Sequence, residues 1–186
     1  MQRAGDDMYH TDKSCKEEVS IPYALCQSEK GNYFIGQTPV LPGENQLALA
    51  ALKNPLRSHV NVYVNAITVT NNSERNVSAE IYLRSTIFRG NVSPLVSCAN
   101  VGIRPAPMPE ANIVYLTEVT NPPNGVPIFS RIVSPFSTLV IDGGQIIISP
   151  GQSLAVFLGG FLPVAQNSTI VAFGWWAEDT RHDHHS

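Results

Sequence analysis

The segment VNVYVNAITVT, residues 60–70, begins with a regular alternation of apolar and polar side chains and then changes phase. Its apolar residues lie on even positions up to residue 64 and on odd positions afterwards: Val60, Val62 and Val64, then Ile67 and Val69. Successive side chains of a strand point to opposite faces, so a regular strand cannot place both sets on one face. The phase change therefore predicts a β-bulge near Asn65–Ala66, or a bend that carries the strand toward a second sheet. Without a bulge, Tyr63, Ile67 and Val69 would pack at a second interface.

Short β-rich runs separated by Gly, Pro and Asn extend on both sides of this segment. Alternation and the content of β-branched and aromatic residues predict strands at 33–37, 46–52, 60–70, 79–88, 112–119, 127–133, 137–141, 145–149, 153–158 and 169–177. The run QLALAAL at 46–52 is also compatible with a helical turn, because Leu and Ala favour helix. The triplet DGG at 142–144 predicts a tight hairpin between two apolar runs. Many short strands joined by such turns predict an all-β fold, a jelly-roll-like antiparallel β-sandwich.

Charge divides the chain into three parts. Residues 1–30 hold six acids and four bases without apolar periodicity, so we expect an extended N-terminal arm there. Residues 31–178 form the predicted β-sandwich domain, and residues 179–186 form a polar tail rich in histidine. Between residues 31 and 177 only six acids and seven bases occur, where an average domain would carry roughly 37 charges. We expect such a body to cover part of its surface with copies of itself, although a surface of Asn, Ser, Thr and Gln is the alternative.

The composition argues against several classes of protein. The net charge of -3 and the pI of about 5.9 provide no basic surface for nucleic acid. No run of 18 apolar residues occurs, so we expect no membrane span. The start, MQRAGDDMYHTDKSCKEE, lacks the apolar core of a classical signal peptide. The protein is therefore expected to stay in the cytoplasm, to leave the cell by another route such as lysis, or to derive from a processed precursor.

Motifs for catalysis and for cofactors are missing from the sequence. It contains no nucleophile elbow, P-loop, H-E-x-x-H or dinucleotide fingerprint. A cupin-type metalloenzyme would carry histidines on core strands, and no predicted core strand has one. His182, His184 and His185 in the tail are weak candidates for zinc, copper or nickel, because a chain end has no framework that fixes their geometry. We therefore expect neither an enzyme nor a bound cofactor.

Two adjacent tryptophans, Trp175 and Trp176, close the last predicted strand. Neighbouring residues of a strand point in opposite directions, so both cannot face the core, and one should be exposed or lie in an interface. That Trp could stack on a sugar ring, with Tyr63 and Tyr82 as further stacking residues. It could equally anchor a subunit contact, or be partly covered by the arm or the tail. A carbohydrate-binding module is accordingly the alternative function.

The three cysteines, Cys15, Cys26 and Cys98, do not have the spacing of a zinc site. Two lie in the predicted arm and one lies in the β-rich body. An odd number leaves at least one thiol free or paired between molecules. Three reduced thiols in a cytoplasmic protein are the alternative.

Several sequence blocks carry a resemblance to a known family: GNYFIGQTPVLP, VNVYVNAITVTN followed by SAEIYL, PIFSRIVSPFSTLV, IIISPGQSLAVFL and AFGWWAE. Over residues 31 to 178 the chain resembles an uncharacterised family of small β-rich proteins from spore-forming bacteria, domain of unknown function 6143. That family has no established activity and implies no catalytic residue.

The plan of a cysteine-bearing arm ahead of a β body is similar, more loosely, to the jelly-roll subunits of endospore appendages. This likeness implies a non-enzymatic structural subunit that self-assembles into a fibre or layer on a spore or cell surface. The arm would contact a neighbouring subunit, where Cys15 or Cys26 would form a disulfide with Cys98. The expected partners are copies of the chain itself.

Overall fold

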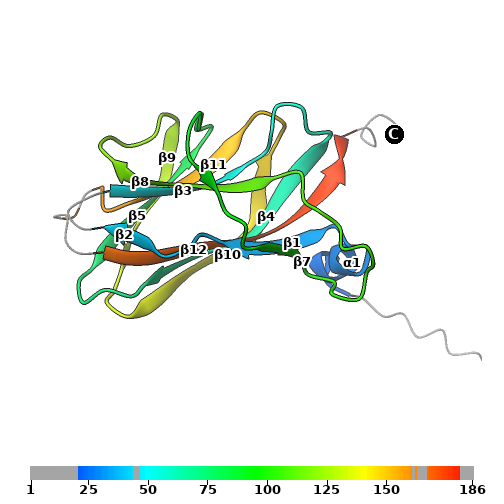
Figure 1. Cartoon of the computed structure of the whole chain (residues 1–186), viewed down its shortest axis with the longest axis horizontal. Coiled ribbons are helices and arrows are strands. Elements are labelled where there is room, and N and C mark those ends of the chain that lie inside the picture. Colours follow the sequence, from blue (N-terminus) through cyan, green and yellow to red (C-terminus); the bar gives the residue numbers. More distant parts are fainter. Residues whose placement is uncertain (1–20, 44–46, 161, 163–166, 181–186) are drawn as a thin grey trace, which may run out of the picture.

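The computed structural model describes residues 21–43, 47–160, 162 and 167–180. Within these residues the chain forms one short helix, α1 (Tyr23–Glu29), and two six-stranded sheets that pack face to face (Figure 1). Sheet A has the order β10 (Ser137–Ile148), β4 (Val60–Asn71), β12 (Asn167–Asp179), β1 (Tyr33–Gln37) and β7 (Val96–Cys98), and β2 (Leu41–Gly43) also pairs with β12. Sheet B has the order β6 (Asn91–Val92), β8 (Asn112–Val119), β3 (Leu47–Lys53), β11 (Ser153–Leu158), β5 (Val77–Leu83) and β9 (Val126–Val133).

The strand pairs show how the chain builds this sandwich. β1 pairs with β12, β3 with β11, β4 with β10 and β5 with β9, each pair antiparallel. The chain thus runs out through four strands and returns beside itself through the last four, as one long hairpin. Rolling this hairpin places β4 beside β12 and β5 beside β11. Eight strands connected in this way make a jelly roll, so the predicted fold class is confirmed.

The segment between β5 and β9, residues 84–125, extends one edge of each sheet. β7 adds to sheet A beside β1, and β8, flanked by β6, adds to sheet B beside β3. β6 and β7 have two and three residues, and β2 has three. Such strands are too short for alternation to predict, and none of them was expected. The other edge of each sheet, among the described residues, is β10 in sheet A and β9 in sheet B.

The phase change in β4 is a β-bulge at the predicted position. Gly174 of β12 pairs with Ala66, and the next residue, Trp175, pairs with Val64, which leaves Asn65 as the extra residue. The apolar side chains on both sides of the bulge enter the same core and are at most 4% exposed: Val62, Val64, Ile67 and Val69. The additional residue therefore resets the alternation, so that both halves of one strand bury their apolar side against one core.

Strand pairing excludes two local predictions, the hairpin at 142–144 and the helical turn at 46–52. The predicted hairpin at 142–144 is wrong, because β10 continues through it as one strand. Asp142 pairs with Ala66 and Ile146 pairs with Val64, so both halves of β10 lie along β4 and the intervening residues form a bulge beside the bulge of β4. The alternative of a helical turn at 46–52 is also excluded, since β3 is a strand held between β8 and β11.

The predicted extended arm falls mostly on residues 1–20, which lie outside the described residues, but its last part is helical. Helix α1 packs at the end of sheet A, beside β1 and β12 (Figure 1). Tyr23 and Gln27, one turn apart on the helix, both donate hydrogen bonds to the carboxylate of Glu178 in β12. The prediction of an extended chain is therefore wrong over α1, because this turn is fixed by contacts with the sheet rather than by its own apolar periodicity.

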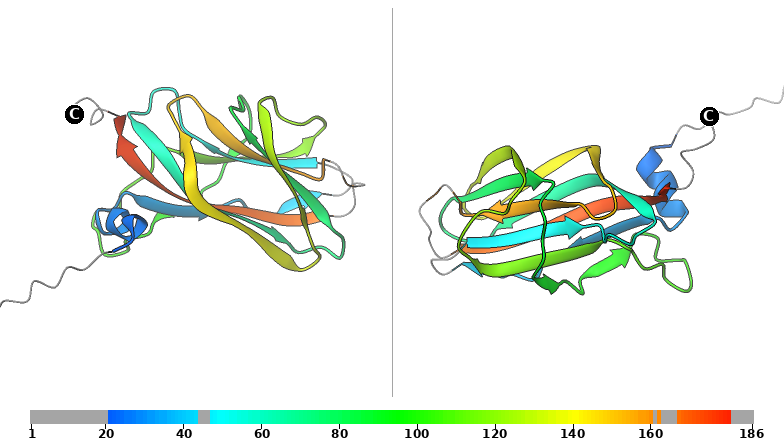
Figure 2. Two further views of the ribbon diagram at one scale, coloured as in Figure 1. Left: turned by 180° about the vertical axis from the view of Figure 1, so that it is seen from behind. Right: turned by 90° about the horizontal axis from the view of Figure 1, so that it is seen from above.

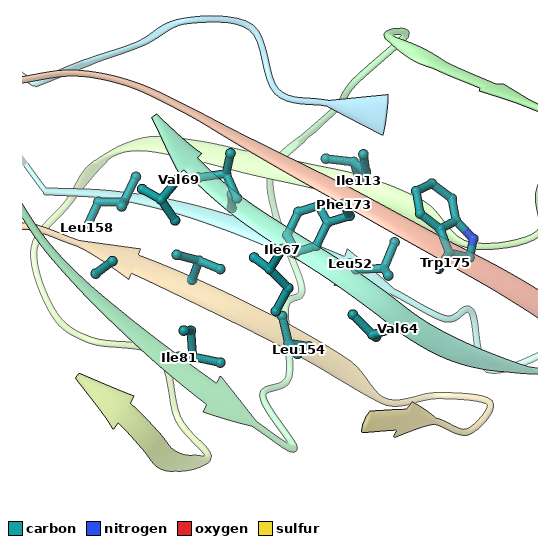
Figure 3. Packing of buried hydrophobic residues seen from close by; sticks show 14 of the residues in the cluster. Leu52, Val64, Ile67, Val69, Ile81, Ile113, Leu154, Leu158, Phe173 and Trp175 are labelled. Atoms are coloured by element: carbon teal, nitrogen blue, oxygen red, sulfur yellow. The ribbon is translucent and has the colours of Figure 1, made fainter. Parts of the chain in front are cut away.

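The main core lies between the two sheets, where side chains from both meet (Figure 3). Leu52 and Leu154 from sheet B and Val64 and Phe173 from sheet A are among the residues labelled there. A second, smaller cluster covers the outer face of sheet B and includes Leu49, Tyr82, Ile87, Val114 and Phe157. Sheet B is thus apolar on both faces, which explains why β11 is buried along its whole length.

Candidate functional site

The outer face of sheet A, which points away from the core, carries few charges. Its outward side chains alternate with inward core residues, and we refer to the following set as the A face: Thr138, Val140, Asp142, Ile147, Ala66, Thr68, Thr70, Ile170, Ala172, Gly174, Ile35 and Gln37. Asp142 is the single charged residue in this set. Val140, Ile147 and Ile35 are 58%, 55% and 51% exposed. The A face therefore presents apolar and small polar side chains over four adjacent strands.

A groove of about 640 Å³ is hollowed into the A face. Small residues of neighbouring strands, Ala66, Ala172 and Gly174, line its floor, while Leu95 before β7 and Tyr33 of β1 also border it. A Cβ atom at residue 174 would lie 2.7 Å from the phenol oxygen of Tyr33, so a larger residue there would displace the Tyr33 ring. The groove thus depends on small side chains in the strands beside the bulge.

The bulge residue also fixes one end of the groove. The side-chain amide of Asn65 donates a hydrogen bond to the phenol oxygen of Tyr33 at 2.9 Å. Asn65 is the extra residue of the bulge and lies between the inward Val64 and the outward Ala66. The feature that lets β4 bury two apolar sets therefore also places a polar anchor for Tyr33.

Beyond the groove, near α1, an aromatic cluster covers Trp176. The indole stacks on Tyr63 with ring centroids 5.4 Å apart and planes 2° apart, and on Tyr33 at 6.4 Å. Tyr23 of α1 contacts it edge-on at 5.8 Å. The hydrogen bond to Glu178, together with desolvation, raises the pKa of Tyr23. Trp176 is 9% exposed, so it is covered by the segment that was expected to be an arm, which was one of the three predicted alternatives.

The other predicted stacking residues are packed inside the protein. Trp175 is fully buried between the sheets, 6.0 Å from the ring of Phe34. Tyr82 is 7% exposed and meets Phe157 edge-on, and burial, with a hydrogen bond to Glu80, raises its pKa. The two tryptophans do point in opposite directions, as alternation predicted. Because they are buried, Trp175, Trp176 and Tyr82 are not available to a sugar or a second subunit, which corrects their assignment as stacking or interface residues. Tyr63 is half-buried against Trp176.

The described cysteines are free thiols in different surroundings. Cys26 lies on α1 and is half-buried. Cys98 is 5% exposed within the main core, and its thiol donates a hydrogen bond of 3.6 Å to the carbonyl of Gly31. Cys15 lies outside the described residues. A thiol of another molecule would have to displace part of the core to reach Cys98.

Metal and membrane sites were also predicted to be missing. The tail candidates His182, His184 and His185 lie outside the described residues. In the part of the chain that is described, no group of three His, Cys, Asp or Glu side chains could hold a metal ion. Among the same residues, no helix combines the length and the apolar character needed to cross a membrane.

Sequence reasoning missed the groove because its residues come from four segments. The one local indication was Gly174, an isolated glycine inside a predicted strand, which often marks a bulge or a close approach. Both features occur here, at Asn65 and at Tyr33.

Comparisons with known proteins show the family of the chain and nothing of its activity. No curated protein and no solved structure has a significant match to this chain. The model of one family, described as a family of unknown function, DUF6143, matches residues 6–182. This match spans nearly the whole sequence and confirms the resemblance to this family that the sequence blocks quoted above indicated. The chain is therefore a member of the DUF6143 family of unknown function.

Proposed function

We propose that this protein is a non-enzymatic structural subunit that self-assembles through its β-sandwich into a fibre or layer. The observation that carries the proposal is the A face, where one charged residue accompanies several large, exposed apolar side chains. Soluble monomers rarely expose such a contiguous apolar surface, and interfaces are depleted in charge at their centres. The A face thus shares the poverty of charge found between residues 31 and 177.

The open edge strand β9 supports the same function. Val126 and Ile132 on this strand are 54% and 55% exposed, and its eight residues form an edge of sheet B. A long, exposed apolar edge strand is a template for pairing with another chain. Residues 1–20 of a neighbour could add along such an edge, as extended arms do in other assemblies. The expected location is a spore or cell surface, with a cytoplasmic assembly as the alternative.

The geometry favours a protein partner over a sugar. Three of the four aromatic residues chosen for sugar stacking are buried, so a carbohydrate site would have to use Tyr33 in the groove. A sugar also needs several polar groups to replace its hydrogen bonds to water. The groove is lined mainly by aliphatic residues and glycines, which suit an apolar side chain better.

Sedimentation velocity and negative-stain electron microscopy of the full chain test self-assembly. The expected result is a concentration-dependent population of species larger than the 20.2 kDa monomer. Ile35→Lys, on the A face, is expected to reduce assembly because it places a charge in the contact. Val101→Lys, at a residue 81% exposed in a loop, is the matched control and should leave assembly unchanged. Monomeric wild-type protein at high concentration in oxidising buffer would contradict the proposal.

The cysteines provide a separate test of covalent linkage. If a disulfide links subunits, Cys15 or Cys26 of one subunit would form it with Cys98 of another. Cys98 would then have to leave the core. A non-reducing gel of assembled material from Cys26→Ser and Cys98→Ser variants separates these routes. Loss of crosslinked species only in Cys98→Ser would support a Cys15–Cys98 disulfide, and loss in both variants would support a Cys26–Cys98 disulfide. Monomer alone in every lane would remove the covalent element.

A further inference from the structure

A short segment protrudes from the side of the sandwich opposite the A face. Residues 84–90, here called the strap, cross the outer face of sheet B between β5 and β6 (Figure 2). Ile87 is buried in the apolar cluster on that face, and the ammonium group of Lys53 donates a hydrogen bond of 2.8 Å to the carbonyl of Ile87. Asn124 accepts a hydrogen bond of 2.9 Å from the backbone N–H of Thr86. The strap is therefore held against the sheet at several points.

The next residue of the strap points the other way. Phe88 is 87% exposed, although its neighbour Ile87 is 8% exposed. A phenylalanine presented to solvent on a segment whose backbone is already held is a large apolar surface that can bind with little further ordering of the backbone. Arg84 and Arg89, both exposed, flank it. The strap thus offers an aromatic side chain between two positive charges.

The groove on the A face has the complementary features. Its volume of about 640 Å³ lies in the range of pockets that take a ligand larger than one aromatic side chain. One row of paired residues crosses the four strands of the A face, in the order Asp142, Ala66, Gly174 and Ile35. Neighbouring strands are about 4.8 Å apart, so the backbone of Asp142 lies about 5 Å from that of Ala66 on the groove floor. The single charge of the A face is therefore acidic and lies beside the groove.

The N-terminal segment and the strap differ in how their charges suit this groove. Residues 1–20 contain eight charged side chains, and the groove has no charged lining residue to pair with them. Burial of unpaired charges is costly, so this segment suits the groove poorly. The strap instead combines one apolar side chain with Arg89 at the next position, which matches an apolar groove beside Asp142.

We propose that the strap of one copy docks in the groove of a second copy, with Phe88 over Ala66 and Gly174 and with Arg89 paired to Asp142. This inference rests on the proposed function and specifies its contact. The strap and the groove lie on opposite faces of one sandwich, so the contact is heterologous. Each copy keeps a free strap on one side and a free groove on the other. Head-to-tail repetition then gives a fibre, or a ring where the rotation closes.

The test compares the full-length wild type with four variants by sedimentation velocity over a range of concentrations. Phe88→Ser is expected to raise the apparent dissociation constant by about tenfold or more, because it removes the central apolar side chain. Arg89→Asp and Asp142→Arg should each weaken assembly, and the double variant with both changes should restore it, since the pair is re-formed with reversed charges. Met108→Ser, at a residue 86% exposed away from both surfaces, is the matched control. Circular dichroism checks that each variant is folded.

The outcomes separate this inference from the proposed function. The strap–groove contact is supported if the wild type assembles, Phe88→Ser weakens the assembly, and the double charge variant restores the assembly that each single charge variant loses. Assembly that is equal in the wild type, Phe88→Ser and both single charge variants overturns the contact while self-assembly through another surface stands. A monomeric wild type overturns both.

Discussion

Deletion of one residue from β4, at Asn65 or at Thr68, tests the reasoning that connects the sequence to the fold. Without Asn65, β4 would alternate regularly along its whole length beside β12, so Val64 and Ile67 would both still face the core. Deletion of Thr68 instead makes Ile67 and Val69 adjacent, and one of the two must then turn outward. Both side chains are at most 2% exposed in the folded protein.

The magnitude follows from the burial of one aliphatic side chain. Full burial of a Val or Ile side chain stabilises a protein by about 1.5–3 kcal/mol, so deletion of Thr68 should cost at least that much, whereas deletion of Asn65 keeps the core side chains inward. For a domain of this size each kcal/mol lowers Tm by about 2–4 °C, which predicts a fall of about 3–12 °C for deletion of Thr68. Urea and thermal unfolding, followed by circular dichroism and tryptophan fluorescence, measure both quantities.

A substitution at the same position separates the bulge from the side chain. Asn65→Ala keeps the chain length and removes only the hydrogen bond to Tyr33, which should cost about 0.5–1.5 kcal/mol. The bulge explanation is refuted if deletion of Asn65 is as destabilising as deletion of Thr68. It is supported if the Asn65 deletion unfolds near the urea concentration of Asn65→Ala and the Thr68 deletion unfolds at a clearly lower one.

Three further predictions concern the aromatic cluster, the thiols and alkaline pH. Trp176→Ala should destabilise the protein by about 3–5 kcal/mol, measured by urea unfolding, and Trp176→Phe by less, because a smaller ring can still stack on Tyr63. Native-state alkylation followed by mass spectrometry should label Cys26 faster than the buried Cys98, and equal rates would show that Cys98 is accessible. Tyr82 has a pKa raised above its ordinary value of 10.0, so its stabilising contribution is complete below that pH and is lost as the pH rises toward the folded-state pKa. Tyr82→Phe should therefore flatten the alkaline decline of the unfolding free energy.

Several elements of the fold follow from local patterns. The predicted strands at 33–37, 112–119 and 153–158 have the same bounds as β1, β8 and β11, and most of the others differ by a residue or two. The bulge at Asn65 could be predicted because a change of parity is visible in eleven consecutive residues. Alternation is a property of consecutive residues and does not depend on which strands become neighbours, so it predicts strands and the bulge without knowledge of the tertiary structure.

The errors share a physical cause, which is that neighbours override local preference. The triplet at 142–144 has the composition of a hairpin turn, but both halves of β10 pair with β4, so β10 continues through the triplet as one bulged strand. Residues 23–29 lack apolar periodicity, but Glu178 and Trp176 hold them as a helix. Similarly, alternation placed Trp176 outside the core without showing that three tyrosines from separate segments would cover it.

The all-β class, the position of the bulge and the scarcity of charge can be predicted from the sequence, because each is a property of composition or of adjacent residues. Which residues share one exposed surface depends instead on the packing of the strands. The A face, its groove and the strap on the opposite side arise when strands distant in sequence become neighbours in a jelly roll. Strand order is set by long-range pairing, and no local pattern of side chains encodes which residues will share a surface.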